Sequence, residues 1–330
     1  MTLIGQQTLI KRLHDAAAAD KLAHAYLMCG AAGSGKRTLA KEIAMLMMCP
    51  DGGCGSCAVC HKVRTGIHPD VIVTSGANKN GTYSVDQIRA LRADVFTMPN
   101  EGRRKIYIIN NAELMPAQAQ DAFLKVLEEP PAYAVFLLLC ADAGKMLATV
   151  LSRTVRLNMA VPSEEESTAL IAERANVPKA TARAALRLCG GSIGQALALL
   201  EKDDPAQLTA ECEEFCGYML EGSAYDMALF ARKKAADKQK FSAFLDLLAL
   251  YFRDILIYKR TSNAALLAFG DSVKEQPGLM RLRVARIARV TEGLLELRKL
   301  SEGKYNANVL EAKLVSICLS GQRHGSAERK

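Results

Sequence analysis

The stretch HAYLMCGAAGSGKRTLAKEIAMLMM, residues 24–48, decides the fold of this chain. Its first part, HAYLMCG, is a short apolar run typical of a buried strand, and TLAKEIAMLMM has apolar positions at helical spacing. Between them, GAAGSGK matches the pattern G-x-x-x-x-G-K, in which backbone N–H groups and a helix N-terminus hold phosphates. The candidate nucleotide-binding residues are Gly30, Gly33, Ser34, Gly35, Lys36, Arg37 and Thr38.

Further apolar runs extend this βα unit into a sheet. KIYIIN at 105–110 and AVFLLLC at 134–140 are separated by a helical stretch that ends at Pro130. Such alternation of strands and helices predicts a parallel sheet. Near residue 161 the strand pattern stops, and the Ser163 to Glu166 spacing predicts a capping box that opens a helix. We expect an α/β domain followed by all-α domains.

The phosphate loop lacks residues that ATP hydrolysis requires. A Ser or Thr should follow the loop lysine to coordinate Mg²⁺, but Arg37 stands there and Thr38 comes one position late. The strand KIYII runs into Asn110 and Asn111, where a P-loop ATPase has acidic residues for the metal and the attacking water. We therefore expect a nucleotide site that is vestigial for Mg²⁺-assisted hydrolysis. Glu113 is the alternative acidic residue, beyond the strand's end.

A cluster of cysteines follows the helix of this unit. Cys49, Cys54, Cys57 and Cys60 supply four thiolates, enough to close tetrahedrally on one Zn²⁺. With four protein ligands the metal would be structural, since catalytic zinc keeps one position open. The alternative is a group of free thiols on a glycine-rich loop.

Composition sets broader limits. The chain has 330 residues, half of them apolar, which predicts a globular protein of two or three domains. Its apolar runs are too short to cross a bilayer, so we expect a cytoplasmic protein without membrane contact. The net charge of +8 permits contact with a polyanion without requiring it.

Several segments together carry a resemblance to a known family. They are LAHAYLMCG before the loop, the cysteine cluster, HPDV at 68–71, SVDQIR at 84–89, FLKVLEEPP at 123–131 and LSRT at 151–154. With them the chain, from about residue 4 to 200, resembles the clamp-loader subunits of bacterial DNA polymerase III, which are AAA+ proteins.

The resemblance extends to one catalytic element. Ser152-Arg153 matches the family's Ser-Arg-Cys motif, whose arginine enters the ATP site of the neighbouring subunit, although Thr154 replaces the Cys. A guanidinium supplied in trans stabilises charge on the transferring phosphoryl group. Arg153 would then be an arginine finger, and the alternative is a surface cation near a strand end.

Within the family, gamma/tau subunits look like complete ATPases, whereas delta-prime subunits often have damaged nucleotide sites. The departures at Arg37, Asn110 and Asn111 therefore resemble the delta-prime type. Gly194 agrees with this, because it falls where the motor subunits carry a sensor arginine. The resemblance implies a non-hydrolysing stator that supports ATP-driven loading of the sliding clamp on primed DNA.

The same resemblance implies the domain organisation and the partners. We expect a RecA-like AAA+ domain at 1–161 with a zinc module at about 49–60, a helical lid at 162–205, a helical collar at 206–322 and a flexible tail at 323–330. The implied partners are gamma/tau and delta subunits in a hetero-pentamer, the sliding clamp, and primed DNA through the complex.

Two alternatives from other classes stay open. In a gamma/tau-like motor, Thr38 would take the metal and Glu113 would act as base, and the chain alone would turn over ATP. A zinc-containing DNA-binding module with a vestigial P-loop would instead bind DNA tightly and salt-sensitively without partners.

Overall fold

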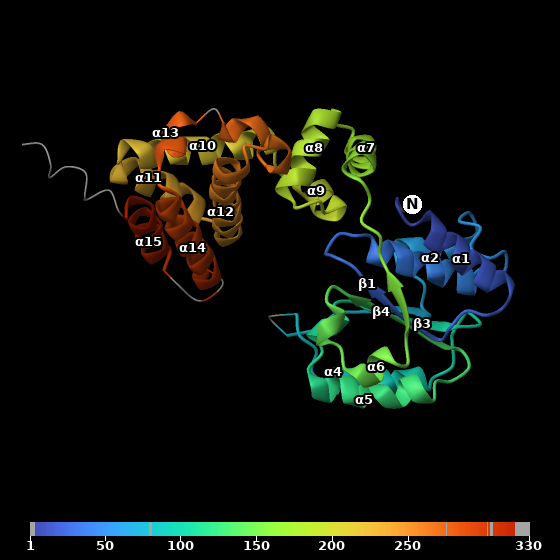
Figure 1. Ribbon diagram of the computed structural model, residues 1–330. Coiled ribbons are helices and arrows are strands. Elements are labelled where there is room, and N and C mark those ends of the chain that lie inside the picture. Colours follow the sequence, from blue (N-terminus) through green and yellow to red (C-terminus); the bar gives the residue numbers. More distant parts are fainter. Residues whose placement is uncertain (1–3, 79–80, 275, 302, 304–305, 321–330) are drawn as a thin grey trace, which may run out of the picture. The chain divides into compact units, whose positions relative to one another are not determined.

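The computed structural model divides the chain into two compact units, each of which is described by itself (Figure 1). One unit holds the residues up to Ser167 together with 192–194, and the other holds 168–191 and the residues from 195 on. The residues that the structure describes are 4–78, 81–274, 276–301, 303 and 306–320. The tail expected at 323–330 lies outside these residues.

The first unit is built on a five-stranded sheet in the order β2-β3-β4-β1-β5, and every strand pairing is parallel. The predicted parallel sheet is thereby confirmed. Its elements are α1 (Gln7–Ala18), β1 (Ala25–Cys29), α2 (Lys36–Met48), α3 (Ala58–Thr65), β2 (Val71–Thr74), α4 (Val85–Val95), β3 (Lys105–Ile109), the 3₁₀ helix η1 (Ala112–Leu114), α5 (Ala117–Glu128), β4 (Ala134–Cys140), the 3₁₀ helix η2 (Ala143–Lys145), α6 (Ala148–Leu151) and β5 (Val155–Asn158).

Alternation along the strands divides the core of this unit into two layers. Tyr26 and Met28 of β1 pack with the helices α1 and α2, whereas Leu27 and Cys29 pack with α4 and α5. Figure 1 shows α1 and α2 on one face of the sheet and α4, α5 and α6 on the other. Because successive side chains of a strand point to opposite faces, a fully apolar strand fits a sheet that is covered on both sides.

The strand register places the candidate nucleotide site. Cys29 at the end of β1 pairs with Cys140 at the end of β4, and Ile109 at the end of β3 pairs with Leu138. The carboxyl ends of these three strands therefore meet at one edge of the sheet. Gly30 and Asn110, which follow β1 and β3, lie at this edge, where ligands bind in parallel α/β sheets.

Two strands, β2 and β5, were not predicted from the sequence. Both are four-residue edge strands with partly exposed side chains. The apolar run of β2, VIVT, is only three residues long, and β5, VRLN, has no two consecutive apolar residues, so both fall short of the runs of about four to eight that predict a buried strand.

The HPDV segment has a structural role. Asp70 is fully buried, and its carboxylate accepts hydrogen bonds from the backbone N–H groups of Asn100, Glu101 and Gly102 at 2.6, 2.8 and 2.7 Å. Burial by itself raises the pKa of Asp70, but these hydrogen bonds outweigh it and hold the pKa below its ordinary value. The carboxylate thus fixes the loop that leads into β3.

Replacing Asp70 by Ala should lower the free energy of unfolding by about 3 kcal/mol, because three N–H donors lose their acceptor. Since folding depresses the pKa, the carboxylate stabilises the protein above its unfolded pKa, near 4, and the contribution is lost as the pH falls through the lower folded value. Urea unfolding at several pH values measures both effects. The matched control is Asp86→Ala, an exposed residue of α4 that pairs only with Arg89 at the surface.

All secondary-structure elements in the described residues of the second unit are helices. Its core gathers aromatic side chains, with Phe215, Phe230 and Phe244 in mutual ring contact. The helices are α8 (Lys179–Leu188), α10 (Pro205–Glu221), α11 (Ala224–Ala235), α12 (Lys238–Thr261), η3 (Ala264–Leu266), η4 (Gly270–Val273), α13 (Pro277–Arg281), α14 (Val284–Ser301) and α15 (Ala307–Leu319), with α7 (Glu164–Ala175) and α9 (Ile193–Leu200) shared between the units.

The predicted end of the strand pattern is confirmed, because no strand follows Asn158 in the described part of the chain. Ser163 and Glu166 form the predicted capping box, in which each side chain accepts a hydrogen bond from the backbone N–H of the other. The helix α10 begins at Pro205. Proline suits this first helical position, where its missing N–H has no intrahelical partner to lose.

The longest described helix, α12, has 24 residues and carries charged side chains along its length. Among the residues that the structure describes, no helix is both long enough and apolar enough to span a bilayer.

Candidate functional site

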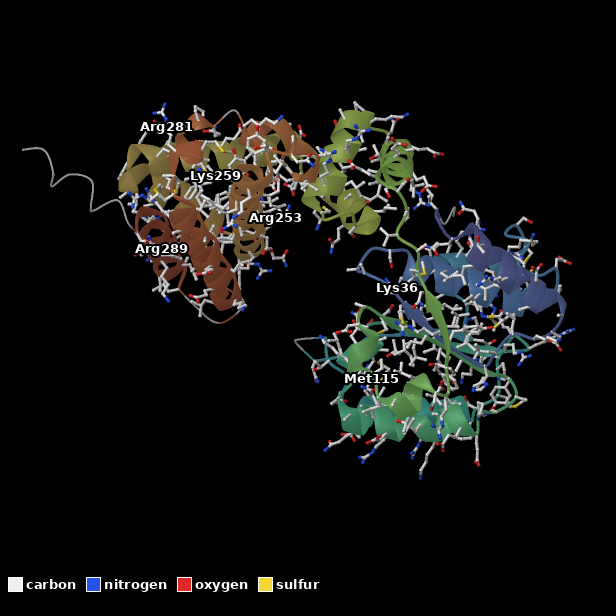
Figure 2. All side chains as sticks on the ribbon, in the orientation of Figure 1. Lys36, Met115, Arg253, Lys259, Arg281 and Arg289 are labelled. Carbon is white, nitrogen blue, oxygen red and sulfur yellow. The ribbon has the colours of Figure 1, made fainter. Side chains whose placement is uncertain are left out.

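The phosphate loop leaves the sheet at the end of β1. Gly30 N–H donates to the carbonyl of Cys140, and the loop then rises to the N-terminus of α2, where Figure 2 labels Lys36. Gly33 and Gly35 have φ of 75° and 88°, values that glycine adopts without strain. The Lys36 ammonium donates to the carbonyls of Gly30 and Ala31. The loop therefore has a cradle shape with its lysine folded back onto the backbone.

The metal-ligating position of this loop is occupied by an exposed cation. Arg37 and Thr38 are successive residues of α2, and neighbouring helical residues point about 100° apart around the axis. Because of this rotation, the partly buried Thr38 presents its hydroxyl in a different direction from a hydroxyl at the exposed position 37. Coordination of a nucleotide-bound Mg²⁺ by a side chain at position 37 is thus lost, while the backbone cradle remains.

Asn110 and Asn111 follow β3, at the place where the sequence analysis expects the acidic residues of a P-loop ATPase. The two amides differ in burial and in hydrogen bonding. Asn110 donates from Nδ2 to the carbonyl of Thr74 at 3.2 Å and to Ser75 Oγ at 3.0 Å, which ties β3 to the end of β2. Asn111 is exposed, with a left-handed backbone of φ 48°. Neither amide can accept a proton as a general base, so the structure gives these residues a role in fixing the strand ends.

Glu113, by contrast, lies close to the loop lysine. Burial lowers the pKa of the Lys36 ammonium, and the charge of Glu113 acts against this. Burial and then the charge of Glu113 raise the pKa of the Cys140 thiol to about 12. Oε2 of Glu113 is buried and has no hydrogen-bond partner among the described residues, and the same holds for Ser34 Oγ in the loop. The 3₁₀ helix η1 therefore carries a buried carboxylate whose charge acts on Lys36 and Cys140.

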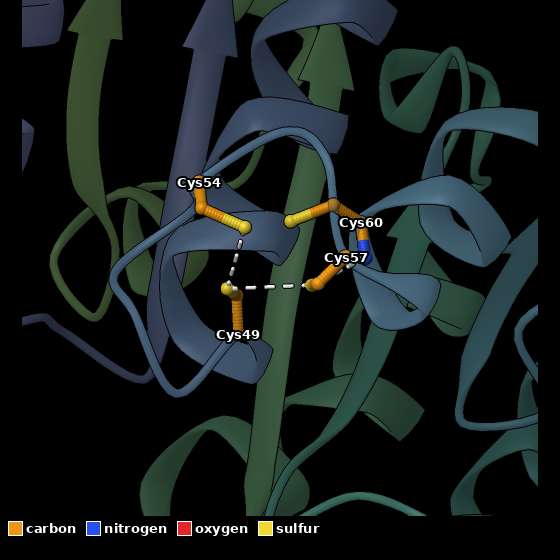
Figure 3. A group of neighbouring side chains, drawn as sticks. All are labelled: Cys49, Cys54, Cys57 and Cys60. Carbon is orange, nitrogen blue, oxygen red and sulfur yellow. Dashed lines mark hydrogen bonds between the residues drawn. The ribbon is translucent and has the colours of Figure 1, made fainter.

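The four cysteines converge on one point, as Figure 3 shows. Cys49 follows α2, Cys54 lies in the next loop, Cys57 caps α3, and Cys60 lies in its first turn. Cys49 Sγ is 3.7 Å from Cys54 Sγ and 3.6 Å from Cys57 Sγ, and all four sulfurs lie within 4.8 Å of one another. Zinc at about 2.3 Å from four sulfurs in a tetrahedron separates them by about 3.8 Å. The donor set and the spacing therefore fit a structural Zn²⁺ held by these cysteines.

The thiols of the cluster differ in their acidity. Hydrogen bonds from the Ser56 backbone and side chain lower the pKa of Cys54 to about 6, whereas burial raises the pKa of Cys60 to about 12. Cys49 and Cys60 are buried, so the cluster is more enclosed than an exposed loop would be. A bound metal ion would displace the proton of Cys60 and stabilise its thiolate by a charge interaction, which would offset the burial of that thiolate.

Arg153 lies between α6 and β5, about one-third exposed. Its Nη2 is 2.6 Å from Glu128 Oε1, and its Nη1 donates to the carbonyl of Thr149 at 3.0 Å and to Ser152 Oγ at 3.3 Å. Ser152 in turn donates to the same Thr149 carbonyl. The Ser-Arg pair is thus a small hydrogen-bonded unit that presents a guanidinium at the surface of the first unit.

The sequence interpretation missed two acidic residues of these sites. Glu128 entered the sequence analysis only as part of the FLKVLEEPP segment, and the structure shows that its carboxylate pairs with Arg153. Glu113 was considered only as an alternative base beyond the strand. The sequence signal for Glu128 was its position at a helix C-terminus, where the helix dipole disfavours a carboxylate and a nearby cation would stabilise it.

The sequence of this chain is similar to that of DNA polymerase III subunits. Residues 5–163 match the family model described as DNA polymerase III, delta subunit. The DNA polymerase III subunit tau of Bacillus subtilis is 30% identical over 285 residues, which are 78% of this chain and 50% of that protein. The DNA polymerase III subunit delta' of Pseudomonas aeruginosa is 35% identical over 175 residues, 52% of this chain and 53% of that protein.

The chain spans about half the length of these two curated relatives. One of them is a tau subunit and the other a delta-prime subunit, so the chain is similar to DNA polymerase III subunits of both types. This similarity does not separate the two types.

Proposed function

We propose that this chain, within the clamp-loader family of DNA polymerase III, is a delta-prime-type stator that does not hydrolyse ATP itself. The observation that carries the proposal is the contrast between two sites of the first unit. Arg153 is held at the surface with its guanidinium partly exposed, while Arg37 and Asn110 stand where metal-ligating groups would be needed. Such a chain supplies a cation to a neighbour and has lost its own metal site.

The mechanism follows from what each part of the chain contributes. Arg153 meets the phosphates of ATP bound in an adjacent motor subunit, and its charge stabilises the transferring phosphoryl group. Ser152 accepts a hydrogen bond from Arg153 and so helps to orient it. Cys49, Cys54, Cys57 and Cys60 would hold a structural zinc, which would fix the segment between α2 and α3 and supply no catalytic chemistry.

The larger assembly is part of the same proposal. The first unit is a RecA-like AAA+ domain at 1–161, followed by a helical lid at 162–205 and a helical collar at 206–322. With gamma/tau and delta subunits the chain closes a hetero-pentamer in the cytoplasm, and that complex loads the sliding clamp on primed DNA. The parallel sheet, the helical second unit and the family match support this arrangement.

A gamma/tau-like motor is the second candidate, and the position of Glu113 favours it. A carboxylate close enough to act on the pKa of Lys36 is where a base for the attacking water is needed. In this candidate Glu113 activates water and Thr38 takes the metal. The direction of Thr38 on α2 and the replacement of both residues after β3 weigh against it.

Reconstitution separates the two candidates. ATP hydrolysis stimulated by clamp and primed DNA is measured for gamma/tau and delta with no third chain, with this chain, and with its Lys36→Ala variant. The stator proposal expects the rate to rise with the chain and to be the same with Lys36→Ala. A rate that falls with Lys36→Ala to the level without the chain, while the complex still assembles, would support the motor.

A further inference from the structure

We propose that Glu128 positions Arg153, holding the guanidinium in its presented orientation before the phosphates of a neighbouring subunit reach it. This inference rests on the proposed function of Arg153 and names the residue on which that function depends. Glu128 is a positioning residue, since it acts only through Arg153.

Both ends of the guanidinium are fixed by groups of this chain. Nη2 meets Glu128 at the end of α5, and Nη1 meets the Thr149 carbonyl and Ser152 Oγ at the end of α6. Three acceptors from two separate elements leave the planar guanidinium few orientations. An arginine side chain has many rotamers in solution, so ordering it costs conformational entropy. If Arg153 is already ordered before the phosphates bind, this cost does not add to the barrier of the reaction.

The backbone of α5 directs this carboxylate. The helix ends at Glu128, the next residue leaves helical geometry with φ −128° and ψ 66°, and two prolines follow. A carboxylate at a helix C-terminus is disfavoured by the helix dipole, whereas the Arg153 guanidinium near the carbonyls that end α6 is favoured. Pairing the two side chains offsets the unfavourable placement of Glu128.

The contact is also weak enough to be exchanged. The two side chains are 35% and 44% exposed, and ion pairs at such positions contribute little to stability. A triphosphate carries several negative charges, so it can take over the guanidinium that a single carboxylate holds. Glu128 therefore orients Arg153 without competing strongly for it.

The test uses the reconstituted complex with Glu128→Ala, Glu128→Gln and the neighbouring control Glu129→Ala. Because other motor sites mask the effect at steady state, kcat here is the rate constant of single-turnover hydrolysis. Glu128→Ala should lower it roughly five-fold at unchanged half-saturating ATP concentration, and Glu128→Gln, which keeps an acceptor, should lower it less. Glu129→Ala should have no effect. In an Arg153→Ala background, Glu128→Ala should change nothing further, because the two residues act as one unit.

A normal kcat with Glu128→Ala, in a complex that loses activity with Arg153→Ala, would overturn the inference and leave the proposed function standing. A raised kcat would overturn it as well, since Glu128 would then restrain Arg153. If Arg153→Ala itself has no effect, the proposed finger fails first. Should Glu128→Ala assemble poorly, the isosteric Glu128→Gln decides the matter.

Discussion

Replacing Arg153 by Ala should lower ATP hydrolysis at the motor site that it serves by about a thousand-fold, the lower end of what an arginine finger contributes. The chain itself should fold and assemble normally. Arg153 is partly exposed, and the ion pair it loses is a surface pair that contributes at most about 1 kcal/mol. The substitution would therefore lower the hydrolysis rate in a neighbouring subunit and leave the stability of this chain nearly unchanged.

The measurement is single-turnover hydrolysis in the reconstituted complex, because other motor sites continue to work and mask the effect at steady state. Arg156→Ala is the matched control, an exposed arginine of β5 whose described side-chain contact is with Asn158. Arg153→Lys should recover only part of the rate, since an ammonium lacks the planar fork of the guanidinium. Equal rates with Arg153→Ala and Arg156→Ala would contradict the finger.

Replacing Cys60 by Ser should release the metal and lower the free energy of unfolding of the first unit by roughly 5 kcal/mol, since a structural zinc contributes on the order of 10 kcal/mol or more of binding energy. Cys60 is buried against the other three thiols, so a hydroxyl there can neither complete the site nor be solvated. The segment between α2 and α3 would lose its order first, because its four cysteines are what close it.

Metal analysis of the purified protein should give about one zinc per chain, and almost none for Cys60→Ser. Cys189→Ser is the control, because this cysteine belongs to the second unit and is not one of the four cysteines of the cluster. A strong chelator should lower the unfolding midpoint of the parent protein and of Cys189→Ser alike. A protein that contains no zinc and unfolds at the same midpoint with and without chelator would show the cluster to be free thiols.

The central fold could be predicted from the sequence because its signals are local. The strand AVFLLLC coincides with β4, and the capping box of Ser163 and Glu166 forms as its spacing predicts. The edge strands β2 and β5 were missed, since the apolar run of β2 is only three residues long and β5 has no two consecutive apolar residues.

The candidate sites divide in the same way. The convergence of the four cysteines could be predicted, since all of them lie within 12 residues of chain. The pairing of Arg153 with Glu128 joins residues 25 positions apart through two helix ends, and no short spacing encodes it. Glu113 could be predicted only as an alternative base, because the sequence does not reveal that its buried charge acts on Lys36.

The most direct test of the stator account is ATP hydrolysis by this chain alone, in the presence of Mg²⁺ and with Lys36→Ala and Glu113→Gln variants alongside. The account predicts no turnover above that of Lys36→Ala, because Arg37, Asn110 and Asn111 have replaced the residues that hold the metal and activate water. Turnover by the parent chain that both variants abolish would contradict it, and would make Glu113 the base of a working motor.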